Sequence, residues 1–248
     1  MSVGGRWTKG RVSRALAKLA RPAGEFNPER YFRGDHGLRF YNVGTKPMRA
    51  FARSIDLEHR GRWSINDAMS LADELIADPY LEVKSVGIEL VARYRRTFTP
   101  KLLPRWKRWL ARNDSANWAT TDAICGMLIG PLLVRHPELA PQMGRWAHDR
   151  NMWVRRASIV GLIPLIRSRH ALELAYGIAE ALHPDEHDLI HKAVGWTLRE
   201  AGKVDPARLE RYLRANGSSI PRTTVRYAIE RFPAAKRREL LAATRRQP

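Results

Sequence analysis

Cysteine is almost absent from this chain, which has one, Cys125, in 248 residues. A single cysteine excludes an internal disulfide bond and any zinc site that depends on several thiolates. Because Cys125 lies in the apolar run 124–128, we predict a small buried side chain there rather than a reactive thiol.

Long hydrophobic runs are also missing. No stretch approaches the roughly 18 uninterrupted apolar residues that a membrane-spanning helix needs. The N-terminal segment 1–21 is basic but contains no apolar core of the kind that a secretory signal requires. We therefore expect a cytoplasmic protein that does not enter a membrane.

Acidic residues are scarce relative to basic ones. The chain has 44 Lys and Arg against 25 Asp and Glu, which gives a formal net charge of +19 at pH 7. Such a charge destabilises the compact state by self-repulsion and is typical of proteins with a polyanionic partner. Nucleic acid and an anionic membrane are the two candidates, and the charge favours nucleic acid.

Strand patterns are almost absent, whereas helical periodicity recurs along the chain. The clearest helical segments are residues 65–76, 83–94, 118–134, 153–166 and 189–199. The short breaks between them, such as Asp78-Pro79, supply a helix-capping residue or a proline. The sequence therefore predicts an all-α fold.

The helical segments repeat at a nearly constant interval. Aligned positions Val83, Ala119, Val154 and Ile190 are separated by 36, 35 and 36 residues. The pattern Asp-x-x-x-x-Val-Lys/Arg, typical of HEAT-type repeats, begins at Asp78 and again at residue 149. A period of this length predicts a HEAT-like α-solenoid of stacked antiparallel helix pairs with a concave basic face. We expect one domain over residues 26–248, preceded by a mobile basic lead-in over residues 1–25, and a monomeric protein.

One position of the repeat carries a charged residue in one repeat and a small apolar residue in the others. Val86, Ala157 and Ala193 share a register in which a small apolar side chain packs against the neighbouring helix. The second repeat has Asp122 there, and a carboxylate at a core position is costly unless it is paired or lines a cleft. Asp122 is therefore either a buried hydrogen-bonding residue or a functional one.

Two tryptophans accompany this carboxylate. Trp118 lies four residues before Asp122, on the same helical face, while Trp196 follows a glycine and precedes Arg199 by three residues. Aromatic rings and cations at helical spacing suit a groove that holds a sugar-phosphate chain. Such tryptophans are more often core residues, and Trp153 occupies the register of Trp118.

Four blocks of the chain resemble the DNA alkylation repair family, the AlkD-type glycosylases built from HEAT-like repeats. The blocks are FYNVGTKPMR at residues 40–49, NWATTD at 117–122, NMWVRRA at 151–157 and KAVGWTLRE at 192–200. The resemblance extends over residues 31–232, and the order and spacing of the blocks carry it.

This resemblance implies roles for individual residues. Asp122 corresponds to the catalytic carboxylate of the family, and Trp118 and Trp196 to the aromatic pair beside the lesion. Arg156, rather than Arg155, corresponds to the arginine that contacts DNA. The further DNA-contacting residues implied within the matching blocks are Arg199, Lys192 and Arg49.

The implied activity is hydrolysis of the N-glycosidic bond of cationic N3- or N7-alkylated purines in double-stranded DNA. Glycosidases ordinarily use two carboxyl groups around an oxocarbenium-like transition state. An alkylated purine leaves without protonation, so one carboxylate is sufficient to stabilise the sugar cation and orient water. The expected reaction needs no metal and no organic cofactor, and DNA binding would keep the protein near the nucleoid.

A histidine-rich stretch offers a competing site. His183, His187 and His191 lie close together with three acidic residues, and the last two have the spacing of helical zinc ligands. Asp188 stands where the familiar zinc-protease motif has glutamate, and acids at a helix start also favour the helix dipole. We therefore expect no metal site.

Two other functions remain open at this point. A non-catalytic relative would use the same face to bind distorted or branched DNA, and the presence of Asp122 with both tryptophans argues against it. A HEAT-type protein-interaction scaffold would need neither the cationic face nor Asp122.

Overall fold

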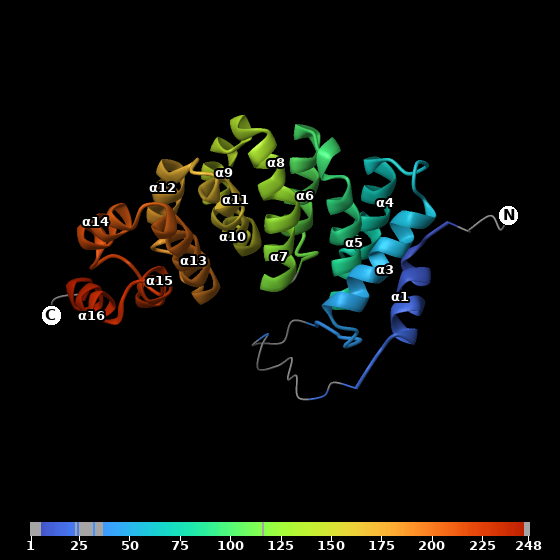
Figure 1. The fold of residues 1–248 in the computed structure, drawn as a ribbon, viewed down its shortest axis with the longest axis horizontal. Helices are drawn as coiled ribbons and strands as arrows, with labels where there is room; N and C mark the ends of the chain where they lie inside the picture. The colour runs from blue at the N-terminus through green and yellow to red at the C-terminus, as the bar shows by residue number, and fades with distance from the viewer. Residues whose placement is uncertain (1–5, 23, 25–31, 33–36, 116, 246–248) are drawn as a thin grey trace. The chain divides into compact units, whose positions relative to one another are not determined.

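The computed structural model describes residues 6–22, 24, 32, 37–115 and 117–245, and the regular elements of this part of the chain are helices (Figure 1). Among the described residues the only β pairing is an isolated parallel bridge between Arg39 and Tyr80. The all-α prediction is confirmed. No helix of the described residues is both long and apolar enough to cross a membrane.

The chain divides into two compact units, residues 1–128 and 129–248. The single domain expected over residues 26–248 stays a prediction. A π-helical segment, Cys125–Ile129, connects the last helix of the first unit with the first helix of the second. Cys125 is fully buried, as expected.

In the first unit the helices form two rows. Its helices are α1 (Lys9–Lys18), α3 (Thr45–Glu58), α4 (Ile65–Leu75), α5 (Leu81–Arg93), α6 (Leu103–Ala111) and α7 (Trp118–Ile124). Helix α5 is central, because α1, α3, α4 and α7 all contact it. Helix α6 lies against α4, where Asp73 accepts hydrogen bonds from Arg105 and from the indole N–H of Trp109. One row is therefore α4 and α6, and the other is α5 and α7.

The second unit repeats this arrangement. Its helices are α8 (Gly130–Arg135), α9 (Pro141–Trp146), α10 (Met152–Val160), α11 (Ile163–Arg167), α12 (Leu172–Leu182), α13 (Asp188–Val204), α14 (Pro206–Asn216), α15 (Arg222–Ala228) and α16 (Ala234–Ala243). Helices α10, α13 and α15 pack in one row, and α9 and α12 in the other. Gly195 permits the contact between α13 and α15, since an added Cβ would lie 2.5 Å from the Cβ of Tyr227.

The N-terminal lead-in is not a mobile tail over its helical part, which corrects the expectation for residues 1–25. Helix α1 buries Val12 and Leu16 completely in the hydrophobic core of the first unit, together with Leu90 of α5. The charge of this segment concealed two apolar positions four residues apart, which is helical spacing. Residues 1–5, 23 and 25 of the lead-in lie outside the described residues.

Three of the four helices at the aligned repeat positions begin in the same way. The carboxylates of Asp78, Asp149 and Asp185 each accept a hydrogen bond from the backbone N–H two residues later, over 2.9 to 3.0 Å. This turn precedes α5, α10 and α13 respectively. Aspartate suits the position because its short side chain satisfies a backbone N–H where the chain enters a helix. The repeat period predicted from the sequence is thus also a period in turn geometry.

A cation links each of two such turns to the next repeat. The Lys84 ammonium donates to the carbonyl oxygens of Ile76, at 2.7 Å, and Asp114, at 2.6 Å. Arg155 donates to the carbonyls of Asp149 and Arg150 and to the carboxylate of Asp185, with Nε 2.6 Å from Oδ2. Lys84 and Arg155 are the basic residues of the repeat pattern, so the pattern marks contacts between successive repeats.

The buried position of Lys84 affects how stability depends on pH. Only 3% of the residue is exposed, and burial lowers the pKa of Lys84 to about 8. The folded state therefore loses this proton near pH 8, whereas the unfolded chain keeps it to about pH 10.4. Between these values the unfolded state binds more protons, so the contribution of Lys84 to stability rises with pH.

We predict that Lys84→Met removes this rise. Wild type should gain about 2 kcal/mol in unfolding free energy relative to the variant between about pH 7.5 and 9.5, measured by urea denaturation. At neutral pH the variant should be less stable by about 1 to 3 kcal/mol, because two buried carbonyls lose their donor. The exposed Lys101→Met is the control; parallel stability curves for wild type and Lys84→Met would contradict the prediction.

Candidate functional site

Helix α7 presents Trp118 and Asp122 one turn apart. The Asn117 side chain caps the helix by accepting from the Thr120 N–H at 2.8 Å, and its amide donates to the Ser115 carbonyl and the Thr120 hydroxyl. Asn117 and Thr120 are buried, whereas Trp118 and Asp122 are half-buried. A fully hydrogen-bonded buried cap thus fixes the turn that carries the two candidate residues, and both remain partly accessible.

The register that singled out Asp122 is confirmed as a core register in the other repeats. Val86, Ala157 and Ala193 are fully buried, while Asp122 at the equivalent position is only half-buried. A carboxylate stands here where the other repeats bury a small apolar side chain. The fold tolerates it because the position is not completely enclosed.

An aromatic ring that sequence reasoning missed lies against Trp118. The Phe32 ring stacks on the Trp118 ring, with centroids 5.4 Å apart and planes inclined by 25°, and also contacts Phe40. Phe32 is almost completely buried. It lies outside the helical repeats, so no periodic signal marked it. Its stacking gives Trp118 a fixed ring orientation.

The segment around residues 40–49 is held in place by one buried carboxylate. Glu82, at the start of α5, accepts from the backbone N–H groups of Tyr41 and Val43. The Tyr41 ring stacks on Tyr80, with centroids 3.9 Å apart. Arg49 extends from this segment as an exposed side chain whose Nε lies 2.7 Å from the Glu89 carboxylate.

Helix α13 carries three of the candidate residues on one face. Lys192, Trp196 and Arg199 are spaced by four and three residues, and each is half-buried. The Lys192 ammonium lies 2.6 Å from Asp188, and this hydrogen bond lowers the pKa of that carboxyl group. Arg199 pairs with Glu230, and among the described residues its Nε is buried without a hydrogen-bond partner.

Arg156 is in a different environment from the other candidate cations. Only 4% of the residue is exposed, and its guanidinium donates to the backbone carbonyl of Leu189. The side chain therefore connects α10 to the first turn of α13. Its neighbour Arg155 is bound to the Asp185 carboxylate. Although burial raises the pKa of Asp185, hydrogen bonds from Arg155 and from the His187 N–H lower it overall.

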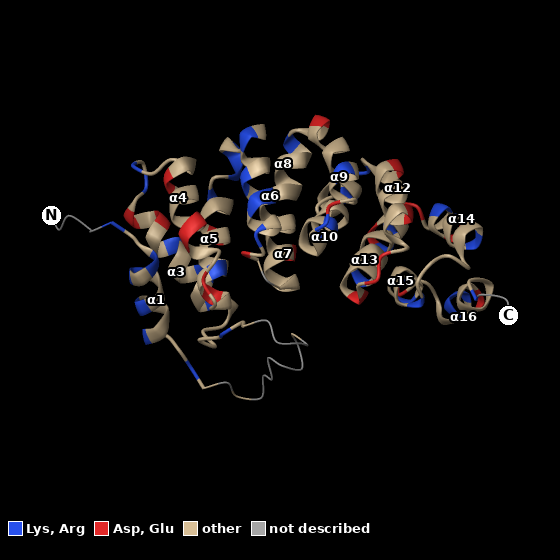
Figure 2. Ribbon diagram, turned by 180° about the vertical axis from the view of Figure 1, so that it is seen from behind, with Lys and Arg blue, Asp and Glu red and all other residues tan. Residues whose placement is uncertain are grey.

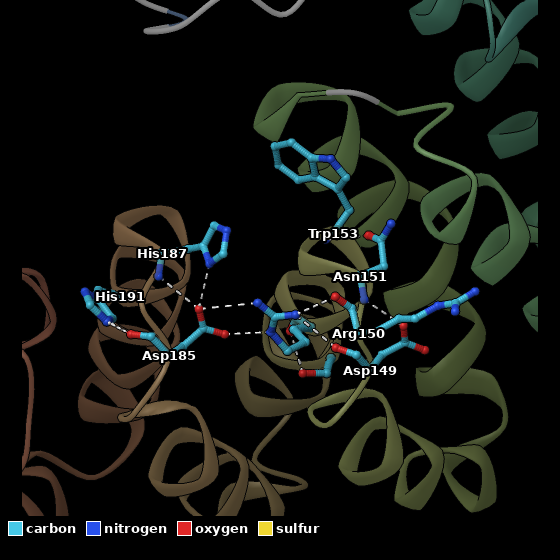
Figure 3. A network of polar contacts seen from close by, with 9 residues as sticks. Asp149, Arg150, Asn151, Trp153, Asp185, His187 and His191 are labelled. Atoms are coloured by element: carbon cyan, nitrogen blue, oxygen red, sulfur yellow. Dashed lines mark hydrogen bonds and ion pairs between the residues drawn. The ribbon is translucent and has the colours of Figure 1, made fainter.

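The histidines of the stretch 183–191 bind different partners. His183 is buried, its Nε2 lies 2.7 Å from the Tyr212 hydroxyl, and burial lowers its pKa to about 4. His187 contacts the Asp185 carboxylate, and His191 bonds to the Asp185 backbone carbonyl (Figure 3). Within the described part of the chain, no group of three or more His, Cys, Asp and Glu side chains is arranged to hold a metal ion.

The candidate residues thus fall into two groups. Arg49, Trp118 and Asp122 belong to the first unit, whereas Arg156, Lys192, Trp196 and Arg199 belong to the second. Within the first unit, α7 places Trp118 beside Asp122; within the second, α13 aligns Lys192, Trp196 and Arg199. Each unit supplies an aromatic ring together with charged side chains.

Comparison with known proteins connects these groups to one family. No curated protein matches the chain significantly in sequence. A solved structure described as a predicted DNA alkylation repair enzyme from Enterococcus faecalis superposes with a TM-score of 0.71 at 17% identity, over 83% of this chain and 93% of that one. That likeness establishes the fold. The family described as DNA alkylation repair enzyme matches residues 12–232, so the chain belongs to the DNA alkylation repair family.

Proposed function

We propose that this protein is a monomeric, cytoplasmic DNA glycosylase that removes cationic N3- and N7-alkylated purines from double-stranded DNA. The observation that carries the proposal is the half-buried Asp122 carboxylate, which stands beside Trp118 in a register that is otherwise buried and apolar. Membership of a repair family supports a role in alkylation damage. The net charge of +19 suits a substrate that is itself a polyanion.

In the proposed reaction the bond between the sugar C1′ and the base nitrogen breaks, and its electron pair leaves with the base. The base already carries a positive charge, so it departs as a neutral purine without a proton from the enzyme. The Asp122 carboxylate stabilises the positive charge that develops on the sugar and orients the attacking water, which loses a proton to solvent. Trp118 and Trp196 pack on the deoxyribose and its backbone and add negative ring faces near the cation.

The basic side chains hold the DNA backbone in this proposal. Arg49, Lys192 and Arg199 all retain partial or full exposure, and each is paired with one carboxylate. Because partly exposed ion pairs are weak, a phosphate replaces the carboxylate at low cost. Arg156 is different: it reaches a phosphate only by leaving the Leu189 carbonyl, and in its present position it fixes α13 relative to α10.

The decisive variant is Asp122→Asn, which keeps the shape of the side chain and removes its charge. We predict that release of 7-methylguanine and 3-methyladenine from methylated duplex DNA falls by at least about 10²-fold, with unchanged DNA affinity. Glu74→Gln, an exposed acid on α4 of the same unit, is the control for the loss of one negative charge. Equal release by wild type and Asp122→Asn would refute the mechanism. DNA binding without release by wild type would favour a non-catalytic DNA-binding protein.

A second variant tests the role of Arg199. Glu230→Gln removes the carboxylate that occupies its guanidinium, so affinity for duplex DNA at low salt should rise by about two- to five-fold. Glu239→Gln is a matched control, because the two glutamate side chains are 50% and 49% exposed and each pairs with an arginine. Fluorescence anisotropy with a labelled duplex measures the difference. The same gain in both variants would mean that only net charge matters and that Arg199 does not contact DNA.

A further inference from the structure

The strongest run of positive charge in the chain lies outside the candidate site. Residues 93–113 contain basic side chains and no acidic ones. The basic residues of this run are Arg93, Arg95, Arg96, Lys101, Arg105, Lys107, Arg108 and Arg112. Helix α6 and the short turns before it carry most of them, and α6 stands out as a blue segment in Figure 2.

Helix α6 is clearly amphipathic. Leu103, Trp106 and Leu110 are buried and fix its inner face. Arg105 and Arg108 lie on the opposite face of α6. Lys101, in the 3-10 turn Pro100–Leu102 directly before the helix, and Arg112, directly after it, continue the same spacing of four, three and four residues. We call these four residues the α6 strip. Between Arg105 and Arg112 this face extends about 10 Å along the helix.

Acidic neighbours neutralise only part of the α6 strip. Asp73 binds Arg105 at 2.5 Å, and Asp114 lies 3.9 Å from Arg112. Lys101 and Arg108 are exposed and have no ion-pair partner among the described residues. The three arginines also line a hollow of about 200 Å³, together with Trp109 and the two aspartates. The strip therefore keeps an excess of positive charge beside this hollow.

The α6 strip does not belong to the row of helices that carries Asp122. Within the first unit α6 packs on α4 through Asp73, whereas α7 contacts α5. A segment of DNA bound over Trp118 and Asp122 would thus contact the row of α5 and α7, and not the row of α4 and α6 that carries the strip. The cations of the strip have no part in the proposed reaction.

We propose that the α6 strip binds the phosphate backbone of a second segment of double-stranded DNA, separate from the segment that holds the lesion. This inference rests on the proposed function for its choice of DNA as the polyanion. Arginine and lysine on one face favour phosphate, and the fork of arginine donors matches phosphate oxygens. Trp106 and Trp109 are buried, so the strip offers no aromatic ring for stacking unpaired bases. This favours duplex over single-stranded DNA.

Such a surface has two measurable consequences. One protein molecule would hold two duplexes at once, and its affinity for undamaged DNA would include counterion release from the strip. A plot of log affinity against log salt concentration has a negative slope, and each lost phosphate contact makes that slope less steep by about 0.9. Contacts of this kind are independent of sequence, so the strip would retain the protein on undamaged DNA without recognising the lesion.

The test is the triple variant Lys101→Gln, Arg108→Gln and Arg112→Gln. The matched control is Arg231→Gln, Arg237→Gln and Arg238→Gln, which removes three exposed cations at or near α16 of the second unit. A bead-bound duplex with methylated purines is mixed with protein and then with a labelled undamaged duplex. Wild type and the control should capture the labelled duplex. The strip variant should capture at least about tenfold less of it. The plot of log affinity against log salt concentration should become less steep by about 2 to 3 for the strip variant.

The remaining outcomes separate this inference from the proposed function. Base release at saturating protein should be unchanged in the strip variant, with an unchanged melting temperature as the check of folding. Strip-dependent capture without base release by wild type would refute the glycosylase and keep the second DNA surface. Equal capture by the strip variant and the control would overturn the inference. So would a loss of binding to anionic lipid vesicles with no loss of DNA capture.

Discussion

The contact on which the repeats depend is a long basic side chain that bridges two successive turns. Lys84 and Arg155 occupy the same position in different units, and each reaches carbonyls of its own turn and the aspartate-containing turn of the next repeat. Carbonyl groups at such turns have no helical partner, so leaving them buried without a donor is costly. A long basic side chain satisfies several of them at once. Stacking of helix pairs then buries the apolar faces that one pair alone leaves exposed.

This constraint also sets where functional side chains are possible. The aspartate turn fixes the entry of α5, α10 and α13, and the buried Asn117 cap fixes that of α7. Where a methyl group follows, as at Ala157 and Ala193, the position closes completely. At Asp122 the same position stays half open, so a carboxylate does not bear the full cost of desolvation.

The features that the sequence predicted are those that recur in every repeat or in several repeats. The interval of 35 to 36 residues correctly indicated the helix pairs, the aspartate turns and the apolar register that makes Asp122 an exception. Features without a repeat were missed. Helix α1 was hidden because its two core residues stand in a strongly basic segment, and Phe32 because its partner Trp118 is far away in sequence. The resemblance chose Arg156 over Arg155 as the DNA-contacting arginine, but only the structure shows how the two pack: Arg156 is buried on Leu189, while Arg155 binds Asp185.

The basic residues therefore serve two physical purposes, which differ in the groups that these residues bind. Lys84, Arg155 and Arg156 donate to backbone carbonyls or a buried aspartate, so removing their hydrogen bonds would leave unsatisfied groups. Arg49, Lys192 and Arg199 each face one partly exposed carboxylate, and such pairs contribute little to stability. A phosphate offers these three cations the same hydrogen bonds and also releases counterions from DNA. In the proposed function these acids keep the site ordered until DNA displaces them. The excess of basic over acidic side chains in the protein then favours replacement of these acids by DNA phosphates.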